Sequence, residues 1–446
     1  MKTKFLFLGL VVSILLCGCN ISEKTTEDVL PKKEFKTIPI EKALESLDAV
    51  LAEIDVDTKS GKRSVRSVET LKSSDLSVET KSSSGLQIEN LAYLVNFENN
   101  RGYAVLAANE IVPDDVVAII DEGEISLQDF LQEHRSDIYD GIDLYCEEED
   151  DYYVGNSSVS SLQFMKDYFT TCTEPKIDFG LDDDFSITFP PGGEYVYTPT
   201  KVGPLLKTTN WHQDPPFNNR ARVTDEATGL RAAAGCVAIA LSQILICNGI
   251  SGTFTYDPIF FGKESMYCDS HTMQGSASVI VANPVKSAMV AHFVRYVGWT
   301  CDTWYFSNMA AFSTATRAKK ALKDEFSFRY KNVKKYNSYR EDVILDMLRK
   351  NKPVFILAFS GHVEYYGWSD PGGAHAWVID GYIKKDGKYL LHCDWGDFGR
   401  ANGYYTSGVF NRVAGPVDRE PGRDDDSGTG SASYGWWYRI ISYDLK

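Results

Sequence analysis

The sequence predicts an α+β fold made of a small N-terminal domain and a larger C-terminal domain. The Pro/Gly-rich stretch Phe189–Gly193 marks the boundary, and all eight tryptophans follow it. Within the larger segment, helical patterns come first and strand patterns second. This order favours a helical part joined to an antiparallel sheet over alternating β-α-β units. The predicted domains span residues 39–195 and 196–446.

The N-terminus carries the pattern of an export signal. Two lysines precede the apolar run Phe5–Leu16, and small residues follow it. About a dozen apolar residues are too few to span a bilayer, and the pattern is typical of a secretory signal. The motif Leu-Cys-Gly-Cys that ends at Cys19 resembles the bacterial lipobox, in which the last cysteine is lipidated. We expect a signal peptide over 1–18, a polar tether over 19–38 and an exported protein held at a bacterial membrane; secretion with an unmodified Cys19 is the alternative.

The composition excludes several classes of protein. Hydrophobic residues make up 43% of the chain and aromatic residues 13%, which predicts packed globular cores. The formal net charge of −16 would repel a polyphosphate, so no nucleic-acid partner is expected. The nine cysteines are scattered and show no CxxC spacing, which argues against a disulfide scaffold and against a zinc site. We predict no cofactor and no metal.

The smaller domain is expected to contain one helix and one β-hairpin. Apolar residues recur at helical spacing over Ile40–Ile54. Residues 57–86 are rich in Ser, Lys and Thr and predict a flexible connection. The apolar runs Leu91–Phe97 and Tyr103–Ala108 flank a polar turn, which is typical of a hairpin.

The larger domain is expected to place three helices before its main strands. The apolar patterns predict helices over 236–248, 315–326 and 339–350, and strands over 353–359, 376–382 and 389–395. The turn Lys385-Asp386-Gly387 joins the last two strands, so their side chains are expected to be neighbours.

Cys236 is the candidate nucleophile. It follows the small residues Ala232–Gly235 and opens an apolar helical segment. The N–H groups of a helix's first turn are unpaired, and the partial positive charge there favours a thiolate. Gly235 and the alanines leave space for a substrate backbone. The alternative is a cysteine buried in a core helix, since free cysteine is among the most buried residue types.

His375 is the candidate general base and acid. Histidine suits this role because its pKa lies near neutrality, so it can hold a thiolate–imidazolium pair and later protonate a leaving amine. His375 stands at a strand start between Ala374 and Ala376, whose small side chains leave room for substrate. An ordinary strand-edge histidine is the alternative. His392, on the next strand, is expected to be structural.

Asp394 is the candidate third group. The predicted hairpin brings its strand beside that of His375, where a carboxylate can accept a hydrogen bond from the second ring nitrogen. Trp395 is expected to shield the pair from water. Asp394 could instead be a turn-facing carboxylate.

These segments resemble a known family. The nucleophile segment 233–238, the histidine segment 374–381 and the Asp-Trp-Gly segment 392–396 are similar to those of the streptopain family of papain-like cysteine peptidases. The segment 210–218 is similar to one near the mature N-terminus of that family, and the hairpin over 92–108 resembles its propeptide.

The resemblance implies a papain-like catalytic domain and an inhibitory N-terminal prodomain. It implies a cysteine endopeptidase made as an inactive precursor, which acts on proteins and peptides and is cut near residues 195–205. It also implies that Gln213 assists the backbone N–H of Cys236 in holding the oxyanion. Two positions depart from the family: Asp394 replaces the usual asparagine, and Asp397-Phe398 replaces a second tryptophan.

Two other functions remain open at this point. A papain-superfamily acyltransferase such as a transglutaminase also uses Cys, His and Asp, and Asp394 fits that set. A catalytically inactive binding lipoprotein that has kept the scaffold is the other alternative.

Overall fold

The computed structural model describes most of the chain from residue 36 onward. The described residues are 36–57, 61–76, 89–112, 114–131, 200–257, 262–307, 310–359, 362–365, 368–371, 374–412, 432–434 and 436–446. The predicted signal peptide, Cys19, nearly all of the polar tether and the predicted cleavage region before residue 200 lie outside them.

The N-terminal segment, residues 36–131, is a small α+β unit. It contains α1 (Ile40–Ile54), β1 (Val65–Lys72), β2 (Asn90–Phe97), β3 (Tyr103–Ala107), β4 (Val116–Ile120) and α2 (Leu127–Leu131). Helix α1 buries the apolar side chains that recur at helical spacing, among them Leu47 and Leu51. Strands β2 and β3 pair in antiparallel register. The helix and the hairpin predicted from the sequence are therefore confirmed.

Strand β1 corrects one prediction. Residues 57–86 were expected to form a flexible connection, but Val65–Lys72 pair with β2 over most of their length. Only Leu71 of this strand is fully buried. The strand lies at the end of the sheet, so its polar composition is tolerated there and hides the strand pattern.

In the C-terminal segment, residues 200–446, the helices precede most of the long strands. They are α4 (Cys236–Cys247), α5 (Ser270–Met273), α6 (Ala277–Val281), α7 (Pro284–Thr300), α8 (Ala315–Asp324) and α9 (Glu341–Arg349). The three predicted helices match α4, α8 and α9. The long helix α7 was not predicted, although Asn283 accepts hydrogen bonds from its first N–H groups and Pro284 opens it.

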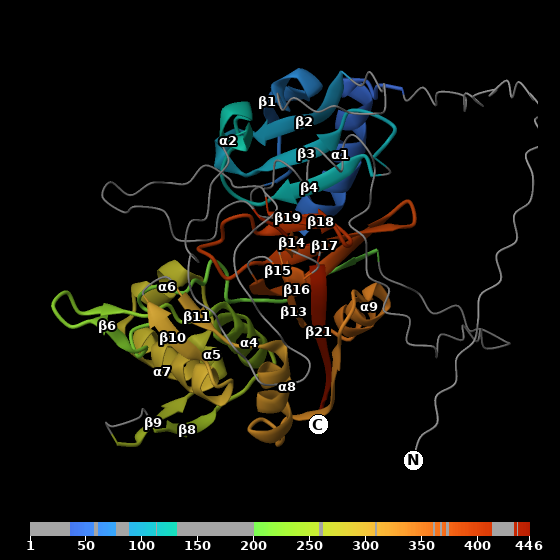
Figure 1. The fold of residues 1–446 in the computed structure, drawn as a ribbon. Helices are drawn as coiled ribbons and strands as arrows, with labels where there is room; N and C mark the ends of the chain where they lie inside the picture. The colour runs from blue at the N-terminus through green and yellow to red at the C-terminus, as the bar shows by residue number, and fades with distance from the viewer. Residues whose placement is uncertain are drawn as a thin grey trace, which may run out of the picture. The chain divides into compact units, whose positions relative to one another are not determined.

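The strands of this segment extend the same antiparallel sheet. Its order is β1-β2-β3-β4-β18-β17-β16-β13-β21-β12, with β5 paired to β16. The C-terminal members are β5 (Lys201–Val202), β12 (Tyr330–Tyr336), β13 (Val354–Phe359), β16 (Ala374–Lys385), β17 (Lys388–Asp394), β18 (Gly403–Thr406) and β21 (Trp436–Leu445). Helix α4 packs against β16 and β13, and α9 packs against β16 and β21 (Figure 1). The predicted α+β architecture, helical part first and antiparallel sheet second, is confirmed.

Short two-stranded ribbons complete the C-terminal segment. They are β6 (Val223–Asp225) with β7 (Leu230–Arg231), β8 (Gly252–Tyr256) with β9 (Glu264–Cys268), β10 (Trp304–Ser307) with β11 (Ala310–Phe312), β14 (His362–Tyr365) with β15 (Trp368–Pro371), and β19 (Phe410–Arg412) with β20 (Ala432–Tyr434). In the described part of the chain, no helix has the length and apolar character needed to cross a membrane.

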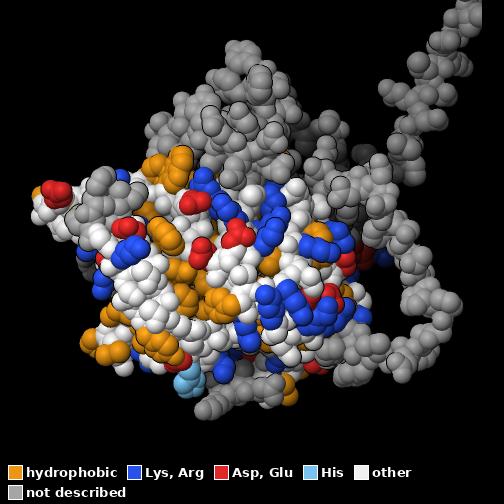
Figure 2. Space-filling view, turned by 90° about the horizontal axis from the view of Figure 1, so that it is seen from below, with side chains coloured by type: hydrophobic (Ala, Val, Ile, Leu, Met, Phe, Trp, Pro, Cys, Tyr) orange, Lys and Arg blue, Asp and Glu red, His pale blue; other side chains and the backbone are white. Residues whose placement is uncertain are grey.

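Charge is distributed unevenly over the surface. Although the formal net charge is −16, Figure 2 shows Lys and Arg side chains gathered on one part of the face it presents. Hydrophobic side chains are exposed on another part of the same face. The net charge therefore describes the chain as a whole and not each face of it.

Candidate active site

Cys236 is the first residue of α4. The preceding Gly235 has a φ of +94°, a conformation that L side chains rarely adopt, and no side chain caps the helix start. The first-turn N–H groups are therefore available to the thiol and to a substrate. Ala232–Ala234 are buried, which fixes the approach to the helix. The sequence prediction of a cysteine at a helix N-terminus agrees with this geometry.

Strand β16 reaches the sulfur of Cys236. Burial raises the pKa of the Cys236 thiol above its ordinary value, and the nearby backbone N–H groups of Ala376 and Val237 offset this only in part. The neutral thiol is therefore favoured until a cation pairs with the sulfur. Because Ala376 follows His375 directly, the candidate nucleophile and base come from neighbouring positions of α4 and β16.

The ring of His375 is held by a main-chain carbonyl. Its Nε2 lies 2.8 Å from the carbonyl oxygen of Trp395. A carbonyl can only accept, so Nε2 carries the proton and donates, and Nδ1 is the nitrogen that can take a second proton. His375 is buried on β16, which restricts the ring further.

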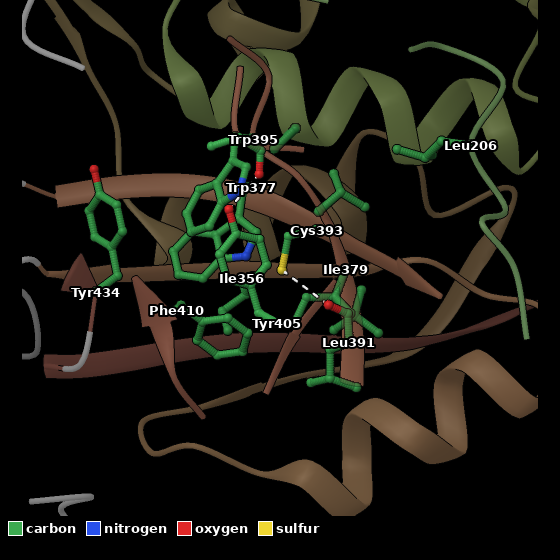
Figure 3. Close-up of a cluster of buried hydrophobic side chains, with 14 of the residues drawn as sticks. Leu206, Ile356, Trp377, Ile379, Leu391, Cys393, Trp395, Tyr405, Phe410 and Tyr434 are labelled. Carbon is green, nitrogen blue, oxygen red and sulfur yellow. Dashed lines mark hydrogen bonds between the residues drawn. The ribbon is translucent and has the colours of Figure 1, made fainter. Parts of the chain in front are cut away.

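Aromatic side chains surround this histidine. The ring of Trp395 stacks near His375 at a centroid distance of 6.0 Å, and Trp377 stacks on Trp395 at 4.6 Å. The ring of Tyr434 lies 5.7 Å from His375. Figure 3 shows Trp377, Trp395 and Tyr434 gathered in one buried cluster. The position of Trp395 fits the predicted shielding role.

Asp394 makes contacts that the sequence did not predict. Its Oδ1 accepts from the N–H of Gly396 at 3.1 Å, and the nearby side chain of Gln243 favours the charged form of the carboxylate. Across the sheet Asp394 stands opposite Val378, three residues beyond His375. The acceptor for Nε2 of the histidine is thus the Trp395 carbonyl, where the sequence predicted the Asp394 carboxylate.

The carboxylate of Asp394 shapes the turn that presents this carbonyl. Its bond to the N–H of Gly396 closes the turn around Trp395, whose own N–H donates to Oδ1 of Asn402 at 2.9 Å. Burial, with the nearby charge of Asp380, raises the pKa of Asp394 to about 6. Direct orientation of His375 by Asp394 stays a prediction, and the contacts give Asp394 a positioning role through Trp395.

Gln213, the predicted oxyanion donor, lies beside the nucleophile segment. Its carbonyl accepts from the N–H of Ala234 at 2.9 Å. The adjacent His212 stacks on Phe398 with ring centroids 3.7 Å apart, and the N–H of Phe398 donates to the carbonyl of Trp211. The loop that follows Trp395 therefore holds the Gln213 loop against the approach to Cys236.

The two small residues proposed for the substrate side differ in their surroundings. Ala374 is exposed at the start of β16. A Cβ on Gly235 would lie 3.4 Å from both Ala311 and Thr303, so the β10–β11 ribbon and the residue before it stand next to the nucleophile loop. This contact was not predicted, because the short ribbon carries no motif.

The described residues contain no group of three or more His, Cys, Asp or Glu placed to hold a metal ion. Five cysteines of these residues are free thiols: Cys236, Cys247, Cys268, Cys301 and Cys393.

Comparison with known proteins identifies the domain that carries this site. Residues 211–405 match the model of the peptidase C10 family. This part of the chain is similar to the peptidase C10 family. The match spans Gln213, Cys236, His375 and Asp394-Trp395. The predicted streptopain-like kinship and the enzyme class, a cysteine-type endopeptidase, are confirmed for these residues.

Two solved structures are similar to the chain. Active interpain A, a cysteine protease of Prevotella intermedia, is 21% identical with a TM-score of 0.38, over 55% of this chain and 98% of that one. A fragment of prointerpain A from the same organism is 16% identical with a TM-score of 0.45, over 84% of this chain and 98% of that one. No curated protein matches the chain.

Proposed function

We propose that this peptidase C10 enzyme cleaves peptide bonds of proteins through a thiolate of Cys236 and an imidazolium of His375. The single observation that carries the proposal is the position of the thiol at the start of α4, near the backbone N–H of Ala376, the residue directly after the histidine. In the reaction, the sulfur attacks the scissile carbonyl and Nδ1 of His375 protonates the leaving amine. Water then hydrolyses the thioester and returns the proton to the ring.

The remaining residues have supporting roles in this scheme. The carbonyl of Trp395 holds Nε2–H, so that Nδ1 faces the reaction. The backbone N–H of Cys236 and the side chain of Gln213 are proposed to stabilise the developing oxyanion, the group on which charge appears in the transition state.

We further propose that the enzyme is made as a latent precursor. The N-terminal segment would be the inhibitory prodomain, and a cut near residues 195–205 would release it. This is supported by the sheet, in which β4 of the N-terminal segment pairs with β18, two strands away from the strand of His375.

The catalytic proposal is tested with the full chain and its Cys236→Ala variant, incubated with casein under reducing conditions. We expect new casein N-termini and loss of the N-terminal segment with the wild type, and neither with the variant. Equal cleavage by both proteins would overturn the assignment of Cys236. Amine incorporation into casein without cleavage would point to the acyltransferase instead, and no reaction of either kind to a binding lipoprotein.

The proposed export and lipid anchor rest on the residues around Cys19. If Cys19 is lipidated, the full chain expressed in a bacterial host should sediment with the membranes. The Cys19→Ser variant should then move to the soluble fraction. An unchanged distribution would leave simple secretion or retention as the explanation.

A further inference from the structure

A row of alternating charges connects the N-terminal segment with the catalytic domain. Asp121 directly follows β4, and its Oδ2 lies 3.0 Å from Nε2 of His392 on β17. The other ring nitrogen, Nδ1, lies 2.6 Å from Oδ1 of Asp380 on β16. With a carboxylate at each nitrogen, both nitrogens donate, and the ring is an imidazolium.

Arg63 continues the row inside the N-terminal segment. Its Nη1 lies 3.5 Å from Oδ1 of Asp121, and its Nη2 lies 3.0 Å from Oδ1 of Asp55. Arg63 and Asp55 are buried. Asp121 therefore stands between two cations, one from its own segment and one from the catalytic domain. None of these groups takes part in the proposed peptide-bond cleavage.

The backbone around Asp121 completes the contact. Strand β4 pairs with β18 in antiparallel register, and the N–H of Asp121 donates to the carbonyl of Asn402 at 2.9 Å. Gly403 has a φ of +154°, and a Cβ there would lie only 2.2 Å from the carbonyl oxygen of Ile119. The two strands thus approach each other where only glycine fits.

Strand pairing alone does not define which residues stand opposite each other. Backbone hydrogen bonds can form in every register, and a slip by one residue moves every side chain of the strand to the opposite face of the sheet. A buried charge with one matching partner penalises every other register, because the charge would lose that partner.

We propose that the ion pair between Asp121 and His392 fixes the N-terminal segment in register on the catalytic sheet and so keeps the precursor latent. The latency rests on the proposed function; the docking itself does not. Removal of the segment would break the pair and expose the edge of β18.

The pH dependence of this contact follows from the groups around His392. They are Asp380 of β16, Asp121 after β4, Tyr404 of β18, Asp394 of its own strand and, through Asp121, Arg63. Burial lowers the pKa of His392, but the two carboxylates outweigh it and raise the pKa to about 10. Burial raises the pKa of Asp121, but the interactions with His392 and Arg63 lower it by more. The net pKa of Asp121 therefore lies below the ordinary value of an aspartate.

These directions determine when the contact weakens. Because the pKa of His392 is raised, the docked state holds the imidazolium proton more tightly. The contribution of His392 to docking is therefore lost as the pH rises toward 10. The lowered pKa of Asp121 means that its contribution is lost only as the pH falls through the ordinary range of an aspartate. Mild acid, near pH 5, is therefore not expected to release the segment.

The test compares two charge removals in the full chain carrying Cys236→Ala, which prevents self-cleavage. Asp121→Asn removes the proposed pair. Asp114→Asn is the matched control, because Asp114 also forms an ion pair with the catalytic domain, at 3.0 Å from Lys388. The two pairs differ in their cations: the side chain of Lys388 is 54% exposed and that of His392 8%, while the carboxylates of Asp114 and Asp121 are 16% and 35% exposed. Hydrogen-exchange protection factors of the β4 and β18 amides are measured.

We expect Asp121→Asn to lower these protection factors by at least about tenfold, because it leaves a buried cation without one of its partners. Asp114→Asn should change them by less than about threefold, because it leaves behind a lysine that water can solvate. Amides of β12 and α9 report global unfolding and should be unaffected. Asp121→Glu, which keeps the charge, should restore part of the protection.

Equal protection in Asp121→Asn and Asp114→Asn would overturn the proposal. This measurement does not require peptidase activity, so it is independent of the proposed function. In the active chain, Asp121→Asn should then lose its N-terminal segment faster than the control. If the β4 and β18 amides lose protection but the N-terminal segment is not removed faster, the link to latency is refuted, while the role of the ion pair in docking still stands.

Discussion

At the scale of single residues, the site depends on how protons are held. Nε2 of His375 donates to the carbonyl of Trp395, which leaves Nδ1 for the thiol chemistry. Burial raises the pKa of the Cys236 thiol, and the backbone N–H groups near it offset this only in part. The imidazolium is therefore needed to hold the thiolate, and a helix N-terminus alone does not suffice.

Asp394 gives a prediction at this scale. Burial and the charge of Asp380 raise its pKa to about 6, so the folded protein binds this proton more tightly than the unfolded chain. Its contribution to stability is then complete below about pH 4 and is lost as the pH rises through about 6. Asp394→Asn should increase the free energy of unfolding near pH 7.5 by up to about 3 kcal/mol and change it little at pH 4.

Chemical denaturation of the Cys236→Ala chain at the two pH values measures this effect. Asp386→Asn serves as the control, because Asp386 lies in the exposed turn after β16 with 85% of its side chain exposed. A stabilisation of the same size at both pH values would contradict the protonation account.

At the scale of elements, the start of α4 decides whether the thiol is correctly placed. Gly235 has a φ of +94°, and a Cβ there would lie 3.4 Å from Ala311 and Thr303; Gly249, just after the same helix, has a φ of +76°, and a Cβ there would meet nothing within 4 Å. Each glycine replaced by alanine should cost about 1–2 kcal/mol of stability through backbone strain.

The two substitutions should differ in their effect on peptidase activity. Gly235→Ala shifts the residue before the nucleophile, and we expect kcat/KM to fall by about tenfold or more. Gly249→Ala lies at the far end of α4 and should leave kcat/KM unchanged. Steady-state kinetics on a peptide substrate, with denaturation curves for both variants, make the comparison. Similar kcat/KM values in the two variants would mean that the helix start does not position Cys236.

The same elements explain what the sequence could and could not predict. The segments of α4, β13, β16 and β17 are almost continuously apolar and are bounded by Gly, Pro or turn residues, so they were recognisable from the sequence. Strand β1 was missed because its edge position requires little apolar surface. Helix α7 was missed because it is buried on several sides and lacks a single apolar stripe.

The candidate active site likewise combines residues that the sequence could predict with contacts that it could not. Cys236 and His375 were predictable because their chemistry requires particular side chains in particular local settings. The acceptor for the histidine was not, because a carbonyl belongs to every residue and only the turn at Asp394–Gly396 presents the one of Trp395. The row from Arg63 to Asp380 combines residues far apart in the chain, and no local pattern indicates it.

At the scale of the whole molecule, one antiparallel sheet is shared by the N-terminal segment and the catalytic domain. Strand β4 extends the sheet at β18, and Asp121 meets His392 at that junction. The proposed release of the segment would therefore remove four strands from the sheet while the strand that carries His375 stays in place. This arrangement separates the inhibitory part from the catalytic machinery.

The central claim is that Cys236 is the nucleophile and that His375 activates it. Burial raises the pKa of Cys247 to about 11 and that of Cys301 to about 12, so neither is expected to react near neutral pH. The most direct measurement is to label the self-processed chain with a peptidyl thiol-directed probe and locate the label by mass spectrometry. The account predicts a label on Cys236 alone, abolished in His375→Ala. A label on the other cysteines, or one that persists undiminished in His375→Ala, would contradict it.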